Sequence, residues 1–237
     1  MTAQIIINSL QYLSDANKAR SMQGFFKTGK GEYAEGDIFW GIIVPKVRQV
    51  ASIYYDISLK NIKQLIKHPV HEVRLCALLI LVEQFKKGSK EEKDTIVDFY
   101  LSNIKYVNNW DLVDLSCYHL LGKYLMDKPK DILYKFARSS KIWKQRIAIV
   151  STLAFIRSND FEDALALSEM LLKQTHPLTH KATGWILREI GKYDESRMID
   201  FLKTYYEKIP RTVIRCAIEK LPEKDRKNIL KGKFEQS

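Results

Sequence analysis

The sequence predicts an all-α fold, and three observations lead to that prediction. Glycine and proline are scarce, with 10 and 6 among 237 residues, whereas an all-β chain needs many of them for its tight turns. Helix start and stop signals recur along the whole chain, and no convincing strand pattern interrupts them. A basic residue followed by small residues also returns inside successive apolar helices, at an interval near 35 residues.

The clearest helix begins after Pro69 and ends before Gly88. Its long apolar run is closed by two lysines, so proline stands early, cations stand late and glycine follows the end. These signals predict a helix of about 17 residues. Ser89 and Glu92 then form a capping box for a second helix across a very short turn. Comparable patterns predict further helices over 108–126, 131–138, 140–157, 161–174, 177–192, 196–208 and 210–220.

The repeat is marked by basic residues at Arg74, Arg146, Lys181 and Arg215, which are 72, 35 and 34 positions apart. The first interval is two periods long, and its midpoint falls at a helix that opens with Trp110. Paired helices at this period are typical of an α-solenoid of HEAT-like repeats with a concave surface. We therefore predict a single HEAT-like repeat domain over 1–237, although the length alone also allows two small domains. If the recurring basic residues face the concave side, it is a basic groove; otherwise they only solvate the ends of packed helices.

The charge balance indicates a polyanion as partner. Lys and Arg number 39 against 28 Asp and Glu, which gives a net charge of +11 at pH 7. The cysteines, Cys76, Cys117 and Cys216, form no CxxC pair and are expected to be buried thiols in a reducing cytosol. No basic region precedes the first apolar residues, and no apolar stretch approaches the ~18 residues of a membrane helix. We therefore expect a cytoplasmic protein that does not bind membranes.

Two motifs that could carry other chemistry are incomplete. The GxxxxGK pattern ending at Lys30 has Gly31 where a phosphate-binding loop needs Ser or Thr for Mg²⁺, and no apolar strand precedes it. His176 and His180 are four positions apart, but Pro177 lies between them and no HExxH motif follows. A Gly-x-Ser-x-Gly elbow is also missing. We therefore expect neither nucleotide hydrolysis nor a metal site, and no cofactor.

Four residues form the strongest candidate site. Trp110 and Asp114 are four positions apart and share one helix face. Arg146 and Trp185 stand at nearly equivalent places in the next two repeats, so adjacent repeats would bring all four to one side. Aromatic faces attract a flat cationic ligand, and a carboxylate stabilises nearby positive charge. The alternative is that both tryptophans belong to the core and that Asp111 or Asp114 caps a helix.

Five segments of the chain, in this order, resemble the AlkD family of DNA alkylation repair enzymes. They are FWGIIVPKVR at 39–48, NWDLVD at 109–114, IWKQR at 142–146, GWILRE at 184–189 and PRTVIRCAIEK at 210–220. The similarity runs from about residue 20 to residue 222, and several motifs agreeing in order are more specific than any one of them. The resemblance implies a HEAT-like solenoid and a DNA glycosylase that removes positively charged N3- and N7-alkylated purines.

The resemblance also implies roles for individual residues. Its active-site positions fall on Trp110, Asp114, Arg146 and Trp185, and a contact with the DNA backbone falls on Arg188. We also expect Lys181 and Arg48 to bind DNA. Asp114 would stabilise developing positive charge on the sugar and help to position water. The tryptophans would contact the lesion nucleotide and exclude water, while Arg146 would bind phosphate. A cationic purine leaves without a general acid, and these motifs show no histidine or second carboxylate beside Asp114.

The expected partner is thus double-stranded DNA with alkylated purines, bound by a monomer that associates with the nucleoid through DNA. Two other classes of function remain open. A HEAT-repeat protein could recognise distorted or branched DNA without catalysis, or the solenoid could be a scaffold for other proteins. Loss of Asp114 would have favoured the first alternative and an acidic or neutral charge balance the second, and neither is seen.

Overall fold

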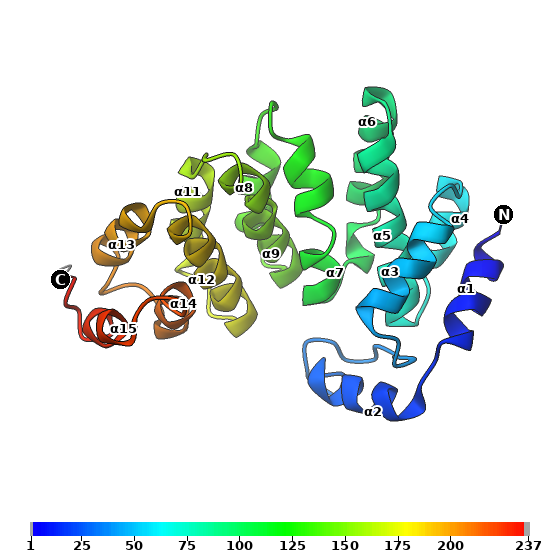
Figure 1. Ribbon diagram of the computed structural model, residues 1–237, viewed down its shortest axis with the longest axis horizontal. Coiled ribbons are helices and arrows are strands. Elements are labelled where there is room, and N and C mark those ends of the chain that lie inside the picture. The colour runs from blue at the N-terminus through cyan, green and yellow to red at the C-terminus, as the bar shows by residue number, and fades with distance from the viewer. Residues whose placement is uncertain (1, 235–237) are drawn as a thin grey trace. The chain divides into compact units, whose positions relative to one another are not determined.

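The computed structural model describes residues 2–234, and across this range the chain is built from helices (Figure 1). The one strand-like feature in the described part of the chain is an isolated parallel bridge between Ile38 and Val70. The all-α prediction is therefore confirmed. The helices pack as two compact units, Met1–Ser116 and Cys117–Ser237. The prediction of one repeat domain stays a prediction.

The first unit is organised around α5 (His71–Lys87), which has the predicted length of 17 residues. Its other elements are α1 (Ala3–Tyr12), α2 (Ala16–Phe25), α3 (Val44–Ile53), α4 (Leu59–Ile66), α6 (Lys90–Ser102), the short 3₁₀ turn η1 (Ile104–Tyr106) and α7 (Trp110–Asp114). Helices α3, α4 and α6 pack on α5. As a result, α5 is buried on all sides for most of its length, which explains why its sequence is apolar all round.

Local signals set the ends of the helices as the sequence predicts. The chain leaves α5 at Gly88, and Ser89 begins α6 with both bonds of the capping box. The Ser89 side chain accepts from the Glu92 backbone N–H, and the Glu92 carboxylate accepts from the Ser89 backbone N–H at 2.7 Å. These bonds satisfy N–H groups that the first turn of a helix would otherwise leave without partners.

The second unit is organised around α12 (Pro177–Gly191), which begins with proline at its first position. Its other elements are the π-helical turn η2 (Tyr118–Gly122), α8 (Asp131–Ala137), α9 (Ile142–Ser151), α10 (Leu153–Ile156), α11 (Glu162–Leu171), α13 (Glu195–Thr204), α14 (Arg211–Ala217) and α15 (Glu223–Ile229). Helices α9, α11, α13 and α14 pack on α12. The paired-helix packing of each unit is that of a helical-repeat fold.

Two of the long helices expected from the sequence are interrupted. Instead of one helix over 108–126, α7 ends after five residues, and the Ser116 hydroxyl donates to the Leu112 carbonyl at 2.5 Å. Instead of one helix over 140–157, α9 and α10 meet at Thr152, whose hydroxyl donates to the Ile149 carbonyl at 2.6 Å. Such side-chain bonds to the backbone compete with the regular ladder and allow a helix to bend or end.

The recurring basic residues do not share one environment. Arg74 is 4% exposed and Arg146 is 7% exposed, whereas Lys181 and Arg215 are exposed. The expectation that this series lines one solvent-facing groove is therefore wrong for Arg74, whose guanidinium is bound to a buried carboxylate. The basic groove itself stays a prediction, carried by the exposed members of the series.

The structure bears on two further predictions, the burial of the cysteines and the lack of a membrane-spanning helix. Cys76 and Cys117 are buried thiols as predicted, but Cys216 is only partly buried. In the range 2–234 no helix is both long enough and apolar enough to cross a membrane.

Candidate functional site

Trp110 and Asp114 stand at the two ends of α7. Asn109 caps this helix, since its Oδ1 accepts a hydrogen bond from the Trp110 backbone N–H at 2.8 Å. Trp110 and Asp114 are partly exposed, whereas Asp111 is only 5% exposed. Asn109 is thus the cap, rather than Asp111 or Asp114, and Trp110 is not a fully buried core residue. Both predicted residues have access to solvent from one short helix.

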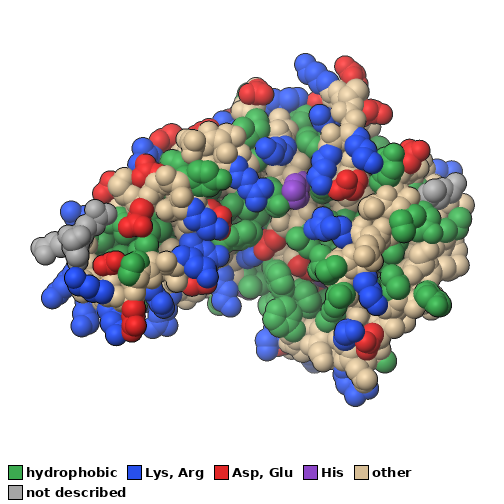
Figure 2. Space-filling view, viewed as in Figure 1, with side chains coloured by type: hydrophobic (Ala, Val, Ile, Leu, Met, Phe, Trp, Pro, Cys, Tyr) green, Lys and Arg blue, Asp and Glu red, His purple; other side chains and the backbone are tan. Residues whose placement is uncertain are grey.

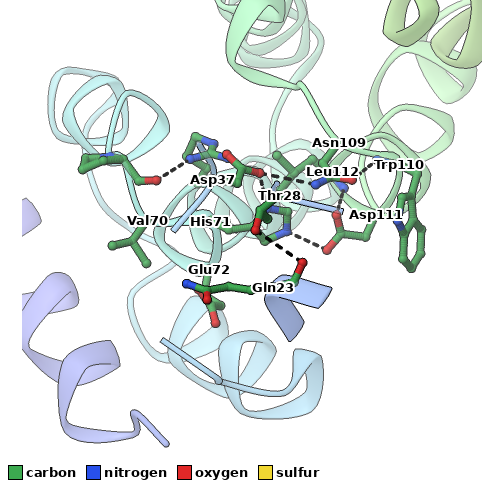
Figure 3. A network of polar contacts seen from close by, with 12 residues as sticks. Gln23, Thr28, Asp37, Val70, His71, Glu72, Asn109, Trp110, Asp111 and Leu112 are labelled. Carbon is green, nitrogen blue, oxygen red and sulfur yellow. Dashed lines mark hydrogen bonds and ion pairs between the residues drawn. The ribbon is translucent and has the colours of Figure 1, made fainter. Parts of the chain in front are cut away.

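The imidazole of His71 lies between two buried carboxylates (Figure 3). Its Nδ1 is 3.1 Å from Oδ2 of Asp37, and its Nε2 is 2.8 Å from Oδ2 of Asp111. Arg74 donates from Nη2 to the other oxygen of Asp37 at 2.5 Å. The Asn109 amide also donates to Asp37, at 3.3 Å. One closed polar network therefore joins the loop before α3, the start of α5 and the first turn of α7.

Burial and charge act in opposite directions on this network. Burial by itself lowers the pKa of His71, but the charge and hydrogen bond of Asp111, with the hydrogen bond of Asp37, raise that pKa to about 9. Burial by itself raises the pKa of Asp37, but the bond to His71 and the charge of Arg74 hold it below its usual range. At neutral pH the network thus contains two carboxylates and two cations.

A stack of aromatic rings connects His71 to Trp110. The ring of Phe39 lies 4.4 Å from that of His71, and Phe26 lies 4.8 Å from Phe39, both pairs with 23° between the ring planes. The indole of Trp110 continues the stack 5.0 Å from Phe26, at 11°. Phe25 meets the indole edge-on and is 66% exposed. These contacts hold the indole in one orientation, and the ring face of Phe39 stabilises a protonated imidazole.

The loop that carries Phe39 is held in place by Glu72. The Glu72 carboxylate accepts hydrogen bonds from the backbone N–H groups of residues 40–42 at 2.8–3.1 Å. Gly41, inside this loop, has a φ of +80°, and a Cβ there would lie 2.2 Å from the backbone oxygen of Asp15. The loop passes close to the start of α2, so only glycine fits at position 41.

In the second unit, Arg146 on α9 is bonded to the beginning of α12. Its Nη1 donates to the Leu178 carbonyl at 2.8 Å, and the side chain is almost fully buried. The neighbouring Gln145 accepts from the Thr179 hydroxyl at 3.1 Å and donates to the Gln174 side chain at 3.0 Å. Arg146 therefore fastens α9 to the helix that carries Trp185. Its expected contact with phosphate stays a prediction.

Lys181, Trp185 and Arg188 form a stripe along α12, because they follow one another at helical spacing. Trp185 is partly exposed, and its Nε1 donates to Glu189 at 3.0 Å. Arg188 pairs with Glu219, and Lys181 is exposed. Figure 2 shows Lys and Arg side chains gathered over the carboxyl-terminal helices of this unit. The exposed cations of α14, α15 and the turn between them are Arg211, Arg215, Lys220, Lys224, Arg226 and Lys227.

The predicted residues thus form two groups, one in each unit. Trp110 and Asp114 share α7 in the first unit, where Arg48 is exposed on α3. Arg146, Lys181, Trp185 and Arg188 lie on or against α12 in the second unit. Within residues 2–234, no set of three His, Cys, Asp or Glu side chains is placed to hold a metal ion.

No motif or spacing in the sequence pointed to the contacts of His71 with its two carboxylates. His71 stands 34 positions from Asp37 and 40 positions from Asp111, so no local spacing pattern links the three. The only available signal is that Asp111 lies inside the NWDLVD segment and that His71 opens the clearest predicted helix. The motifs therefore pointed to Asp114 but not to His71, the buried histidine that is bonded to the helix of Asp114.

The pairing of helices around α5 and α12 defines a helical-repeat protein. A family model described as DNA alkylation repair enzyme matches residues 6–221, and the chain belongs to this family, whose role is the repair of alkylated DNA. A solved structure described as a predicted DNA alkylation repair enzyme from Enterococcus faecalis is 16% identical and has the same fold, with a TM-score of 0.69. The match covers 89% of this chain and 97% of that one. No curated protein sequence matches the chain significantly.

Proposed function

We propose that the protein is a DNA glycosylase that hydrolyses the N-glycosidic bond of positively charged N3- or N7-alkylated purines in duplex DNA. It would act as a monomer in base excision repair, in the cytoplasm and on nucleoid DNA. The observation that carries the proposal is the shared helix of Trp110 and Asp114. Both side chains are partly exposed on α7, which is fastened to the core of its unit by Asn109 and Asp111. The family of the chain and its net charge of +11 support DNA as the substrate.

The proposed chemistry assigns the central role to Asp114. When the bond from the sugar C1′ to an alkylated purine breaks, the electron pair goes to the base and cancels its positive charge. The base therefore leaves without being protonated. The sugar gains oxocarbenium character, which the Asp114 carboxylate stabilises electrostatically. Water then adds to C1′ and releases a proton to the solvent, and Asp114 helps to position that water.

The remaining residues bind the substrate. Trp110 contacts the lesion nucleotide from the first unit and excludes water, and Trp185 has the corresponding role in the second unit. Arg188, Lys181 and Arg48 bind the phosphate backbone through charge-assisted hydrogen bonds. Arg146 adds positive charge and fixes the start of α12, which carries Trp185.

The proposal is tested by incubating the protein with duplexes that carry 7-methylguanine or 3-methyladenine and measuring free base by chromatography. Release by the wild-type protein, but not by Asp114→Asn, is the expected result. If neither duplex releases free base under conditions in which the protein binds both, the proposal is contradicted.

The stripe on α12 favours a second candidate function, which is DNA binding without catalysis. Its cations could bind the phosphate backbone even if the protein cleaved no bond. Lys181 and Arg188 lie on α12, which packs on α14 and its exposed cations Arg211 and Arg215. A non-catalytic protein with this surface would recognise distorted or branched DNA. It would bind such DNA at least as tightly as alkylated duplex and would release no base.

A further inference from the structure

We propose that His71 is a positioning residue: by binding Asp37 and Asp111 at the same time, it clamps α7 so that Trp110 and Asp114 are presented to the substrate in one fixed geometry. The inference deepens the proposed function and rests on it for the catalytic consequence. The clamp itself can be tested without activity.

The contacts of the two ring nitrogens determine the protonation state of His71. A neutral imidazole has one N–H donor and one nitrogen lone pair. In this structure both nitrogens face carboxylate oxygens, Asp37 at 3.1 Å and Asp111 at 2.8 Å. A lone pair at either position would face a negative oxygen inside a buried site, since His71 is 1% exposed. With both carboxylates ionised, both bonds form only when the ring is an imidazolium and each nitrogen donates.

Charged groups from three segments of the first unit surround His71. Arg74 and Glu72 both lie on α5. Arg74 forms an ion pair with Asp37, and the Glu72 carboxylate accepts hydrogen bonds from the backbone of residues 40–42. Asp37 approaches from the loop before α3 and Asp111 from α7. The imidazolium and the Arg74 guanidinium balance the two bonded carboxylates. A neutral ring would leave an uncompensated negative charge in this buried site, which is why its pKa is raised to about 9.

Helix α7 has only five residues and cannot be stable alone. Its first turn is held by polar contacts: Asp111 is bonded to His71, and Asn109 is bonded to Asp37. The Trp110 indole is held separately, by the aromatic stack that ends on the His71 ring. Asp114 follows Asp111 by one helical turn. Removing the charge of His71 therefore loosens the backbone that carries Asp114 and the rings that orient Trp110.

The test uses the full-length protein labelled for NMR at histidine and tryptophan. The variants are Asp111→Asn, which keeps the shape and removes the charge, and His71→Gln, which identifies the His71 signal among five histidines. The matched control is His68→Asn, which changes a partly buried histidine three positions earlier whose bond is to the Val70 N–H. Trp110→Phe identifies the indole signal. If His71→Gln does not fold, Asp111→Asn still answers the question.

In the wild-type protein at neutral pH, we expect both ring nitrogens of His71 to carry protons. Asp111→Asn should lower the His71 titration midpoint by about 1–3 pH units and shift the Trp110 indole signal. The same variant should slow base release by about 10–100-fold, as loss of an orienting partner typically does. Its affinity for duplex DNA should change by less than about twofold. His68→Asn should leave all four measurements unchanged.

A singly protonated His71 at neutral pH would overturn the clamp, as would an unchanged Trp110 signal in Asp111→Asn. A shifted indole signal with an unchanged rate of base release would overturn the positioning role and leave the clamp as structure alone. If the NMR results hold and the wild-type protein releases no base, the proposed function fails and the clamp stands.

Discussion

Gly184 of α12 and Cys216 of α14 are so close that a Cβ on Gly184 would lie 2.5 Å from the Cβ of Cys216. The same added atom would lie 2.6 Å from the Val213 backbone oxygen. The absence of a side chain at Gly184 therefore sets the distance between these helices. Trp185 follows Gly184 directly, and Arg188 lies one turn further along α12, so this packing also places the stripe of residues proposed to contact DNA.

Replacing Gly184 by alanine should lower the free energy of unfolding by about 1–3 kcal/mol, because the added methyl group overpacks a contact with backbone. The measurement is urea unfolding followed by circular dichroism. Gly24→Ala is the matched control, since Gly24 lies in α2 and a Cβ there meets nothing within 4 Å. That change should stabilise the protein by about 0.4–1 kcal/mol. Equal effects of the two substitutions would contradict the close approach at Gly184.

Replacing Asp114 by asparagine should abolish most base release while leaving DNA binding nearly intact. The change keeps the size of the side chain and removes its charge, and loss of one preorganised electrostatic partner typically costs about 10²–10³ in rate. Single-turnover release of 7-methylguanine and fluorescence anisotropy of the same duplex provide the two measurements. Unaltered release would exclude Asp114 as the catalytic carboxylate. Asp111, three positions earlier on α7, could not take over that role in this structure, because it is buried and bonded to His71.

DNA affinity should fall steeply with salt, because the net charge of +11 and the stripe on α12 indicate binding through phosphates. The slope of log K against log salt concentration should be about −0.9 for each phosphate neutralised. Lys181→Ala should make the slope less steep by about one phosphate. Affinity that barely changes between low and moderate salt would count against DNA as the partner and favour a protein-binding scaffold.

Substrate choice should follow the charge of the base. We expect release of 3-methyladenine or 7-methylguanine and little release of uracil or hypoxanthine from otherwise identical duplexes at neutral pH. Neutral bases need a proton donor in order to leave. The histidine bonded to α7 does not supply one, because His71 is buried and both of its nitrogens are engaged by Asp37 and Asp111. Efficient excision of uracil would require a general acid elsewhere.

Stability should decrease as pH rises through the titration of His71. The folded protein raises the pKa of His71 from 6.5 to about 9, so the folded state binds the proton more tightly than the unfolded chain. This contribution is fully present below about pH 6.5 and is lost as pH approaches 9, with a size of up to about 3 kcal/mol. Urea unfolding across this range measures it. His71→Gln should remove the pH dependence, and an identical profile in that variant would assign the dependence to another group.

The sequence by itself determined the helices whose signals are local. The 17-residue α5, the capping box of Ser89 and Glu92, and the proline start of α12 all depend on residues within a few positions of one another. Such features depend only on neighbouring residues, so they need no tertiary contact. The sequence also supplied the pair of Trp110 and Asp114, because residues four positions apart share a helix face.

Only the tertiary structure decided which polar residues are buried and what they bind. Arg74 belongs to the same repeating series as Lys181, yet Arg74 is bonded to Asp37 inside the first unit while Lys181 is exposed. His71 meets Asp111 across 40 positions of sequence. A contact between residues so far apart leaves no periodic pattern, since it depends on how whole helices pack. Tertiary packing therefore gives α7 its fixed place and His71 its charge.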